Sequence, residues 1–171
     1  MKKQKTTFEK VTEFHKVFGH PAGTTPGTPS VKQMKFRVRF ILEETVEHIM
    51  ALGARHAQNQ HLARAAELME KAREQILMAN DYEFRDPDII GIADSLGDLD
   101  YVVSGAALTY GIDLPAVVEE IHSSNMSKLG VDGKPIYDEE DKVKKGPNYR
   151  KPDLASVLFP EEAVDDAEEA E

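Results

Sequence analysis

The chain has 171 residues, a formal net charge of -10 and no cysteine. This length suffices for one domain with a hydrophobic core, and the lack of cysteine excludes disulfides, thiolate metal sites and a cysteine nucleophile. Seven acidic and no basic residues lie among the last eleven, which leaves a net charge of -3 on the rest. We therefore expect no broad basic face for nucleic acid.

The ends of the chain predict neither a signal peptide nor a membrane anchor. The N-terminus, Met1-Lys2-Lys3-Gln4-Lys5, is basic but runs into a polar amphipathic segment. No stretch approaches the roughly 20 apolar residues that span a bilayer, so we expect a cytoplasmic protein with no membrane partner. The composition predicts a single helical domain over residues 1–159 and an acidic disordered tail over 160–171.

The first third of the chain predicts two helices. Thr6 and Glu9 have capping-box spacing at the start of a helix that runs to Phe18. A loop over 19–29 follows, with three prolines and three glycines. Ser30 starts a second helix that reaches about Gly53 and has an apolar stripe of Val38, Leu42, Val46 and Ile49.

Three glutamates lie beside that stripe. Glu44 and Glu47 are three residues apart and share one face of the helix, with Glu43 on its edge. They have no obvious basic neighbour in their own segment. A solvated helix face accounts for three such glutamates as well as a functional site does.

Two further helices follow. His56–Asn80 is a strong helix former with alternating surface charges, and we interpret it as structural. Asp86 and Pro87 have the residue types of an N-cap and a first helical position for a helix that ends before Gly111. Apolar residues of this last helix lie on most of its sides, which predicts a central, largely enclosed element.

Asp94 and Asp98 stack one turn apart on the enclosed helix. No lysine or arginine occurs between Arg85 and Lys128, a stretch of 42 residues with eight acids. Buried carboxylates must therefore meet bases from elsewhere, such as Arg37, or take up protons, or bind cations. Facing the glutamates of the second helix would add like charge, which favours cations, and an all-oxygen set suits Mg²⁺.

The last part of the chain predicts a fifth helix and then irregular structure. Asp113 caps a helix over Pro115–Ser127, and residues 129–159 form an irregular segment with a turn at Asp132-Gly133. A third of the chain's bases lie from Lys128 to Lys151. Together these elements predict an all-α fold, an antiparallel bundle of about five helices with an irregular, basic C-terminal segment.

The acidic motifs and two later ones resemble a known family. Glu-Glu-x-x-Glu on one helix is followed by an acid-x-x-x-Asp helix that continues Leu-Asp-Tyr-Val-Val. With Ser124–Lys128 and Lys145–Tyr149, these motifs resemble the MazG-like nucleotide pyrophosphohydrolases, in particular a phage and bacterial branch. That all-α superfamily also contains phosphoribosyl-ATP pyrophosphohydrolase and the dimeric dUTPases, and the likeness covers about Phe14–Leu154.

The resemblance implies a set of metal ligands and a base. Glu44, Glu47 and Asp98 match the metal-binding acids of the family's E-x-x-E and E-x-x-D motifs, and Glu43 matches a glutamate that serves some members as the base. The chain departs from the pattern at position 95, where Ser95 replaces an acid and Asp94 becomes the substitute ligand. It also has an extra helix around His61–Asn80 between the two acidic motifs.

The activity implied is Mg²⁺-dependent hydrolysis of a nucleoside triphosphate to the monophosphate and pyrophosphate, with Mn²⁺ as a substitute metal. Candidate phosphate contacts are Arg37, Lys128 and Lys145, and Tyr101 and Asn125 are candidates for orienting the sugar or base. Alternatives are specificity for dUTP or phosphoribosyl-ATP, or a non-catalytic helical module that binds nucleotide. Related enzymes work as homodimers or homotetramers, so the resemblance implies a homo-oligomer.

Overall fold

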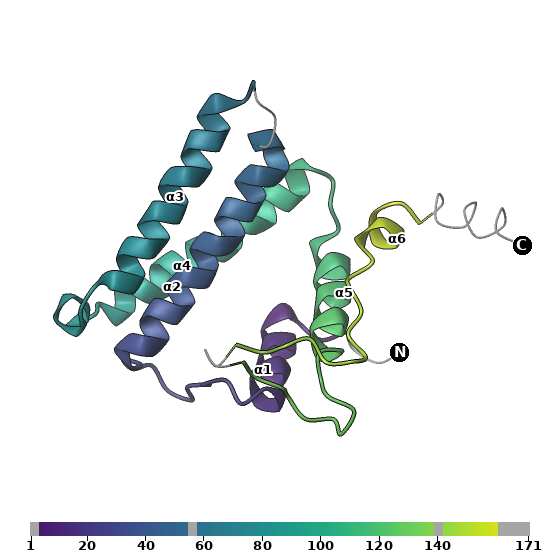
Figure 1. The fold of residues 1–171 in the computed structure, drawn as a ribbon, viewed down its shortest axis with the longest axis horizontal. Coiled ribbons are helices and arrows are strands. Elements are labelled where there is room, and N and C mark those ends of the chain that lie inside the picture. Colours follow the sequence, from purple (N-terminus) through teal and green to yellow (C-terminus); the bar gives the residue numbers. More distant parts are fainter. Residues whose placement is uncertain (1–3, 55–57, 139–141, 161–171) are drawn as a thin grey trace, which may run out of the picture. The chain divides into compact units, whose positions relative to one another are not determined.

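The computed structural model describes residues 4–54, 58–138 and 142–160. Over these residues the chain forms six α-helices and no strand, which confirms the predicted all-α class (Figure 1). The helices belong to two compact units. Unit 1 comprises the described residues up to Thr24 and from Asp94 onward, and unit 2 those of 25–93. The predicted tail lies, from residue 161, outside the described residues, and the domain limits 1–159 stay a prediction.

Unit 2 is built on two helices that pack side by side, α2 (Val31–Ile49) and α3 (Gln60–Met78) (Figure 1). Ser30 and Gln33 form a capping box at the start of α2, as the sequence predicts. At its end α2 passes into a π-helical turn, η1 (Met50–Ala54), where Gly53 has a φ of 110°. The Asn59 side chain donates a hydrogen bond of 2.8 Å to the Gly53 carbonyl, which ties the start of α3 to this turn.

The third helix is shorter than predicted. It begins at Gln60 rather than His56, and residues 55–57 lie outside the described residues. At its far end Lys35 of α2 donates hydrogen bonds to the carbonyls of Leu77 and Ala79. A 3₁₀ turn, η2 (Asp81–Phe84), then leads toward the next helix.

The fourth helix, α4 (Ile89–Thr109), starts two residues later than predicted. The prediction that Asp86 caps it is wrong, because Asp86 adopts a left-handed φ of 50° before Pro87. Asp88 takes that role instead, since its carboxylate accepts hydrogen bonds from the backbone of Ile90 and Gly91 at 3.0 Å. The helix ends as expected before Gly111, which has a φ of 68°.

The side chains of α4 are exposed in the single chain, contrary to the prediction of an enclosed helix. Eight of its large apolar side chains are 39–83% exposed, and only Ala107 is buried. Within their own unit these apolar side chains are therefore largely uncovered. Among the described helices no single one is long and apolar enough to cross a membrane, although α4 and α5, bent by 110°, would suffice together by length and composition.

Unit 1 is held together by contacts between α1 (Thr7–Val17) and α5 (Leu114–Met126). Both helices start with the predicted caps, a Thr6–Glu9 capping box and Asp113. Lys10 is only 3% exposed and forms an ion pair of 2.6 Å with Glu119 of α5. This pairing satisfies a cation that would otherwise be costly to bury.

The C-terminal segment is irregular, as predicted, but it includes an unpredicted short helix, α6 (Leu154–Leu158), capped by Asp153. An isolated β-bridge joins Tyr137 and Val143. The Tyr137 hydroxyl donates to the carbonyl of Phe18, the most completely buried large side chain among the described residues. The segment is thus anchored to the end of α1 as well as to α5.

Gly146 brings the segment into close contact with the end of α5. Its backbone N–H donates a hydrogen bond of 3.0 Å to the Lys128 carbonyl. A Cβ atom at this position would lie 2.2 Å from the carbonyl oxygen of Leu129, a distance that no side chain tolerates. The approach therefore requires glycine.

We predict that Gly146→Ala lowers the free energy of unfolding by about 2 kcal/mol, because the backbone must move to relieve the overlap. In a thermal melt this corresponds to a midpoint about 4–8 °C lower. Gly27→Ala is the matched control, since nothing lies within 4 Å of the Cβ added there. Equal midpoints for the two variants would contradict the close approach.

Candidate functional site

The glutamates of α2 lie on the helix as their spacing predicts. Glu44 and Glu47 are exposed and one turn apart, whereas Glu43 is half-buried. Arg37 lies nearly two turns before Glu44 on the same helix and is also exposed. Unit 2 therefore holds four of the predicted site residues on a single rigid element.

Glu43 has a basic neighbour, so the expectation that these glutamates lack one is wrong for this residue. The Nε of Arg39 lies 3.8 Å from Oε2 of Glu43, and the two side chains are 24% and 31% exposed. Both atoms are buried and neither has a hydrogen-bond partner among the described residues. The pair is therefore electrostatic, in surroundings where an isolated carboxylate oxygen would be costly.

The third helix adds a second arginine to this neighbourhood. Arg73 of α3 makes two hydrogen bonds to Glu70, one turn earlier. These bonds raise the pKa of Arg73, and the negative charges of Glu70, Glu43 and Glu74 raise it further. The extra helix thus brings positive charge toward Glu43, a role that its surface-like charge pattern did not predict.

The aspartates of α4 form the second acidic pair. Asp94 and Asp98 are exposed and one turn apart, and Tyr101 is 80% exposed on the same helix. Neither aspartate has an ion-pair partner in the part of the chain that the structure describes, which agrees with the lack of bases in this stretch of sequence. Because both aspartates are exposed, burial does not require that their charges be neutralised in the single chain.

The structure brings three predicted substrate contacts together at the end of α5. The backbone N–H of Lys128 donates to the Asn125 carbonyl at 3.2 Å, and the Lys128 carbonyl accepts from Gly146 at 3.0 Å. Lys145 directly precedes that glycine, and its ammonium lies 4.7 Å from the centre of the Tyr149 ring. Residues 18 positions apart in sequence, Lys128 and Gly146, thus lie beside one another in unit 1.

Each unit therefore carries part of the predicted site. Unit 2 has Arg37 and the three glutamates, and unit 1 has the two aspartates, Tyr101 and the group at the end of α5. Across residues 4–54, 58–138 and 142–160, no three histidine, aspartate or glutamate side chains gather into a group that could hold a metal. The donors present in each unit are a pair of carboxylates, whose hard oxygens suit Mg²⁺.

Two groups of residues near the site escaped the sequence analysis. Arg39 precedes Glu43 by four residues, a spacing that signals an ion pair on a helix and could have been recognised. The ion pair between Glu120 and Arg150 joins residues 30 positions apart, and no local sequence pattern predicts it.

Comparison with known proteins places the chain in a family. The sequence profile of a family described as phosphoribosyl-ATP pyrophosphohydrolase matches residues 11–125, more than half of the chain. The chain belongs to this family. All five predicted acids lie in the matched range, whereas Lys128 and Lys145 lie beyond it.

A solved structure supports the fold. A crystal structure of a "putative NTP pyrophosphohydrolase" from Exiguobacterium sp. 255-15 superimposes with a TM-score of 0.68 and 24% sequence identity. The match covers 99% of this chain and 100% of the other. No curated protein matches the chain. The family is therefore established by the sequence profile, and the solved structure bears on the fold alone.

We predict that Arg39→Ala lowers the free energy of unfolding by about 1 kcal/mol, because it leaves a buried Glu43 oxygen without its nearest opposite charge. Thermal melts should show a midpoint about 2–4 °C lower. Arg64→Ala is the matched control, since it removes an exposed pair with Glu67 that is worth little. A loss no larger than that of the control would mean that Arg39 does not stabilise Glu43.

Proposed function

We propose that this protein is a Mg²⁺-dependent nucleoside triphosphate pyrophosphohydrolase, which cleaves between the α and β phosphates to give a monophosphate and pyrophosphate. The observation that carries the proposal is the family match over residues 11–125, because it includes both acidic motifs. The order of these motifs along α2 and α4 supports it, as does the one-turn spacing of the acids on each helix.

The metal ligands proposed are Glu44, Glu47, Asp94 and Asp98. They form a donor set of carboxylate oxygens only, which Mg²⁺ prefers, with Mn²⁺ as a substitute. Ser95 cannot replace the acid that the family pattern has at this position, and Asp94 supplies a carboxylate one residue earlier. When bound, Mg²⁺ neutralises phosphate charge and makes water beside it more acidic.

Glu43 is proposed to accept the proton of the attacking water. A base must be ionised at the working pH and must have an oxygen that can accept a hydrogen bond. Oε2 of Glu43 lies 3.8 Å from Nε of Arg39 and has no hydrogen-bond donor among the described residues. This oxygen therefore keeps its capacity to accept a hydrogen bond.

The substrate contacts proposed are Arg37, Lys128 and Lys145 for the phosphates, and Tyr101 and Asn125 for the sugar or base. The exposure of Tyr101 and the proximity of Asn125, Lys128 and Lys145 favour this assignment. The family description names phosphoribosyl-ATP, so that substrate, and a narrower preference such as dUTP, are tested beside the common nucleotides.

We predict that Glu47→Gln and Asp98→Asn each lower Mg²⁺-dependent pyrophosphate release by about 100-fold or more. Substituting even a residue that only hydrogen-bonds to a metal ligand lowers metal affinity or activity about 10- to 100-fold. The assay measures pyrophosphate released from a panel of ribo- and deoxyribonucleotides and phosphoribosyl-ATP, with and without Mg²⁺. Circular dichroism should show unchanged helix content in both variants.

Glu67→Gln in α3 is the matched control and should retain full activity, because Glu67 is paired with Arg64 and Lys71 on an exposed face. Undiminished turnover in both site variants would remove these acids from the mechanism. Nucleotide binding without release of any product from the wild-type protein would instead support the non-catalytic module.

We also propose that the protein is a homo-oligomer in which a second copy covers α4. Isolated soluble chains rarely leave an extended apolar surface in water. A stable interface buries about 800 Å² on each partner, an area that the exposed apolar side chains of one 21-residue helix could largely supply. The side chains that carry most of this surface are Ile90, Tyr101, Val102 and Leu108, each at least 59% exposed.

We predict that the double variant Val102→Lys/Leu108→Lys lowers the molar mass measured by light scattering to that of one chain, because two charges would have to be buried at the interface. Met78→Lys is the control, since Met78 is 77% exposed on α3 and should leave the mass unchanged. A wild-type mass of one chain at assay concentrations would refute the oligomer.

A further inference from the structure

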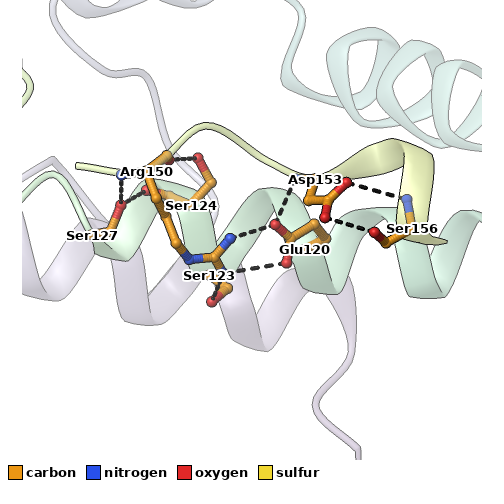
Figure 2. Close-up of polar contacts among 7 residues, drawn as sticks. All are labelled: Glu120, Ser123, Ser124, Ser127, Arg150, Asp153 and Ser156. Carbon is orange, nitrogen blue, oxygen red and sulfur yellow. Dashed lines mark hydrogen bonds and ion pairs between the residues drawn. The ribbon is translucent and has the colours of Figure 1, made fainter. Parts of the chain in front are cut away.

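Several side chains on one face of α5 bind Arg150 of the C-terminal segment. Glu120, Ser123, Ser124 and Ser127 recur at helical spacing and all contact Arg150 (Figure 2). We call this group, with Arg150 itself, the Arg150 clip.

The clip engages both the side chain and the backbone of Arg150. Its guanidinium donates two hydrogen bonds to the Glu120 carboxylate and one to Ser123. Its backbone N–H donates to the Ser127 hydroxyl at 3.0 Å, and its carbonyl accepts from the buried Ser124 hydroxyl at 2.8 Å. A bidentate contact fixes orientation as well as distance, so the residue is held in one geometry.

Within the clip, Arg150 and Glu120 form an ion pair. Hydrogen bonds from Arg150 and from the backbone of Asp153 lower the pKa of Glu120, and Glu120 raises the pKa of Arg150. Arg150 is one of the bases that the sequence concentrates between Lys128 and Lys151. In the structure its guanidinium has an internal partner.

The clip also fixes the direction of the segment. Asp153 contacts Glu120, Arg150 contacts residues 123–127, and Gly146 contacts Lys128, so the segment runs antiparallel to the second half of α5. At the end of this run Tyr149, next to Arg150, lies 4.7 Å from the ammonium of Lys145. The clip thereby fastens the stretch that contains Lys145, whose neighbour Gly146 is hydrogen-bonded to the Lys128 backbone.

We infer that the Arg150 clip positions Lys128 and Lys145 as one phosphate-binding pair, so that Arg150 and Glu120 are positioning residues for nucleotide binding. This inference rests on the proposed function. Lysine carries a point charge on a flexible side chain. If two lysines are ordered before the nucleotide binds, binding loses less conformational entropy. The clip itself does not touch the substrate.

The test is a double-mutant cycle on nucleotide hydrolysis in the full-length protein. Arg150→Ala is expected to raise KM about 10-fold and to change kcat less than about 2-fold, because it loosens ground-state binding. Lys145→Ala should raise KM by a similar factor. The double variant should raise KM by clearly less than the product of the two single effects, because Arg150 acts in part through Lys145.

Two further variants separate positioning from folding. Arg150→Lys keeps the charge but not the bidentate fork, so it should raise KM several-fold while the thermal midpoint stays near that of the wild type. Arg64→Ala removes an exposed arginine–glutamate pair in unit 2 and should leave KM unchanged.

Additive effects of Arg150→Ala and Lys145→Ala on KM would overturn the positioning role while leaving the pyrophosphohydrolase intact. An unchanged KM in both Arg150 variants would do the same. Failure of the wild-type protein to hydrolyse any nucleotide in the panel would instead overturn the proposed function, and this inference with it.

Discussion

The account depends on the fixed one-turn spacing that a helix imposes on its carboxylates. Glu44 and Glu47 lie one turn apart on α2, and Asp94 and Asp98 lie one turn apart on α4. Each helix therefore presents two negative charges in a defined geometry. In water two such charges repel by only about 1 kcal/mol, which an exposed helix tolerates. We propose that the repulsion becomes costly where bound substrate excludes water, and that a divalent cation relieves it.

The two units contribute different chemistry to the proposed reaction. Unit 2 carries the glutamates, where Arg39 lies beside Glu43 and Arg73 of α3 interacts electrostatically with the same carboxylate. Unit 1 supplies the aspartates and an ordered basic segment that the Arg150 clip fastens to α5. The extra helix α3 therefore adds positive charge near Glu43 through Arg73.

Local signals in the sequence predicted much of the fold. The capping boxes at Thr6 and Ser30 and the cap at Asp113 were predicted correctly because each depends on side chains within four residues of the helix start. The prediction for Asp86 is wrong because an aspartate suits a cap by residue type, whereas its backbone here is left-handed. Contacts between distant residues, such as Glu120 with Arg150, could not be predicted from local patterns. The apolar periodicity of α4 predicts an enclosed helix, but periodicity does not say what covers an apolar face.

The most direct test is a crystal structure with Mn²⁺ and a non-hydrolysable triphosphate analogue, in which anomalous scattering locates the metal. The account predicts metal peaks about 2.1 Å from carboxylate oxygens of both pairs, with Glu44 or Glu47 and Asp94 or Asp98 among the ligands and analogue phosphates beside them. Metal bound by one pair only, or phosphates held away from all four carboxylates, would contradict it.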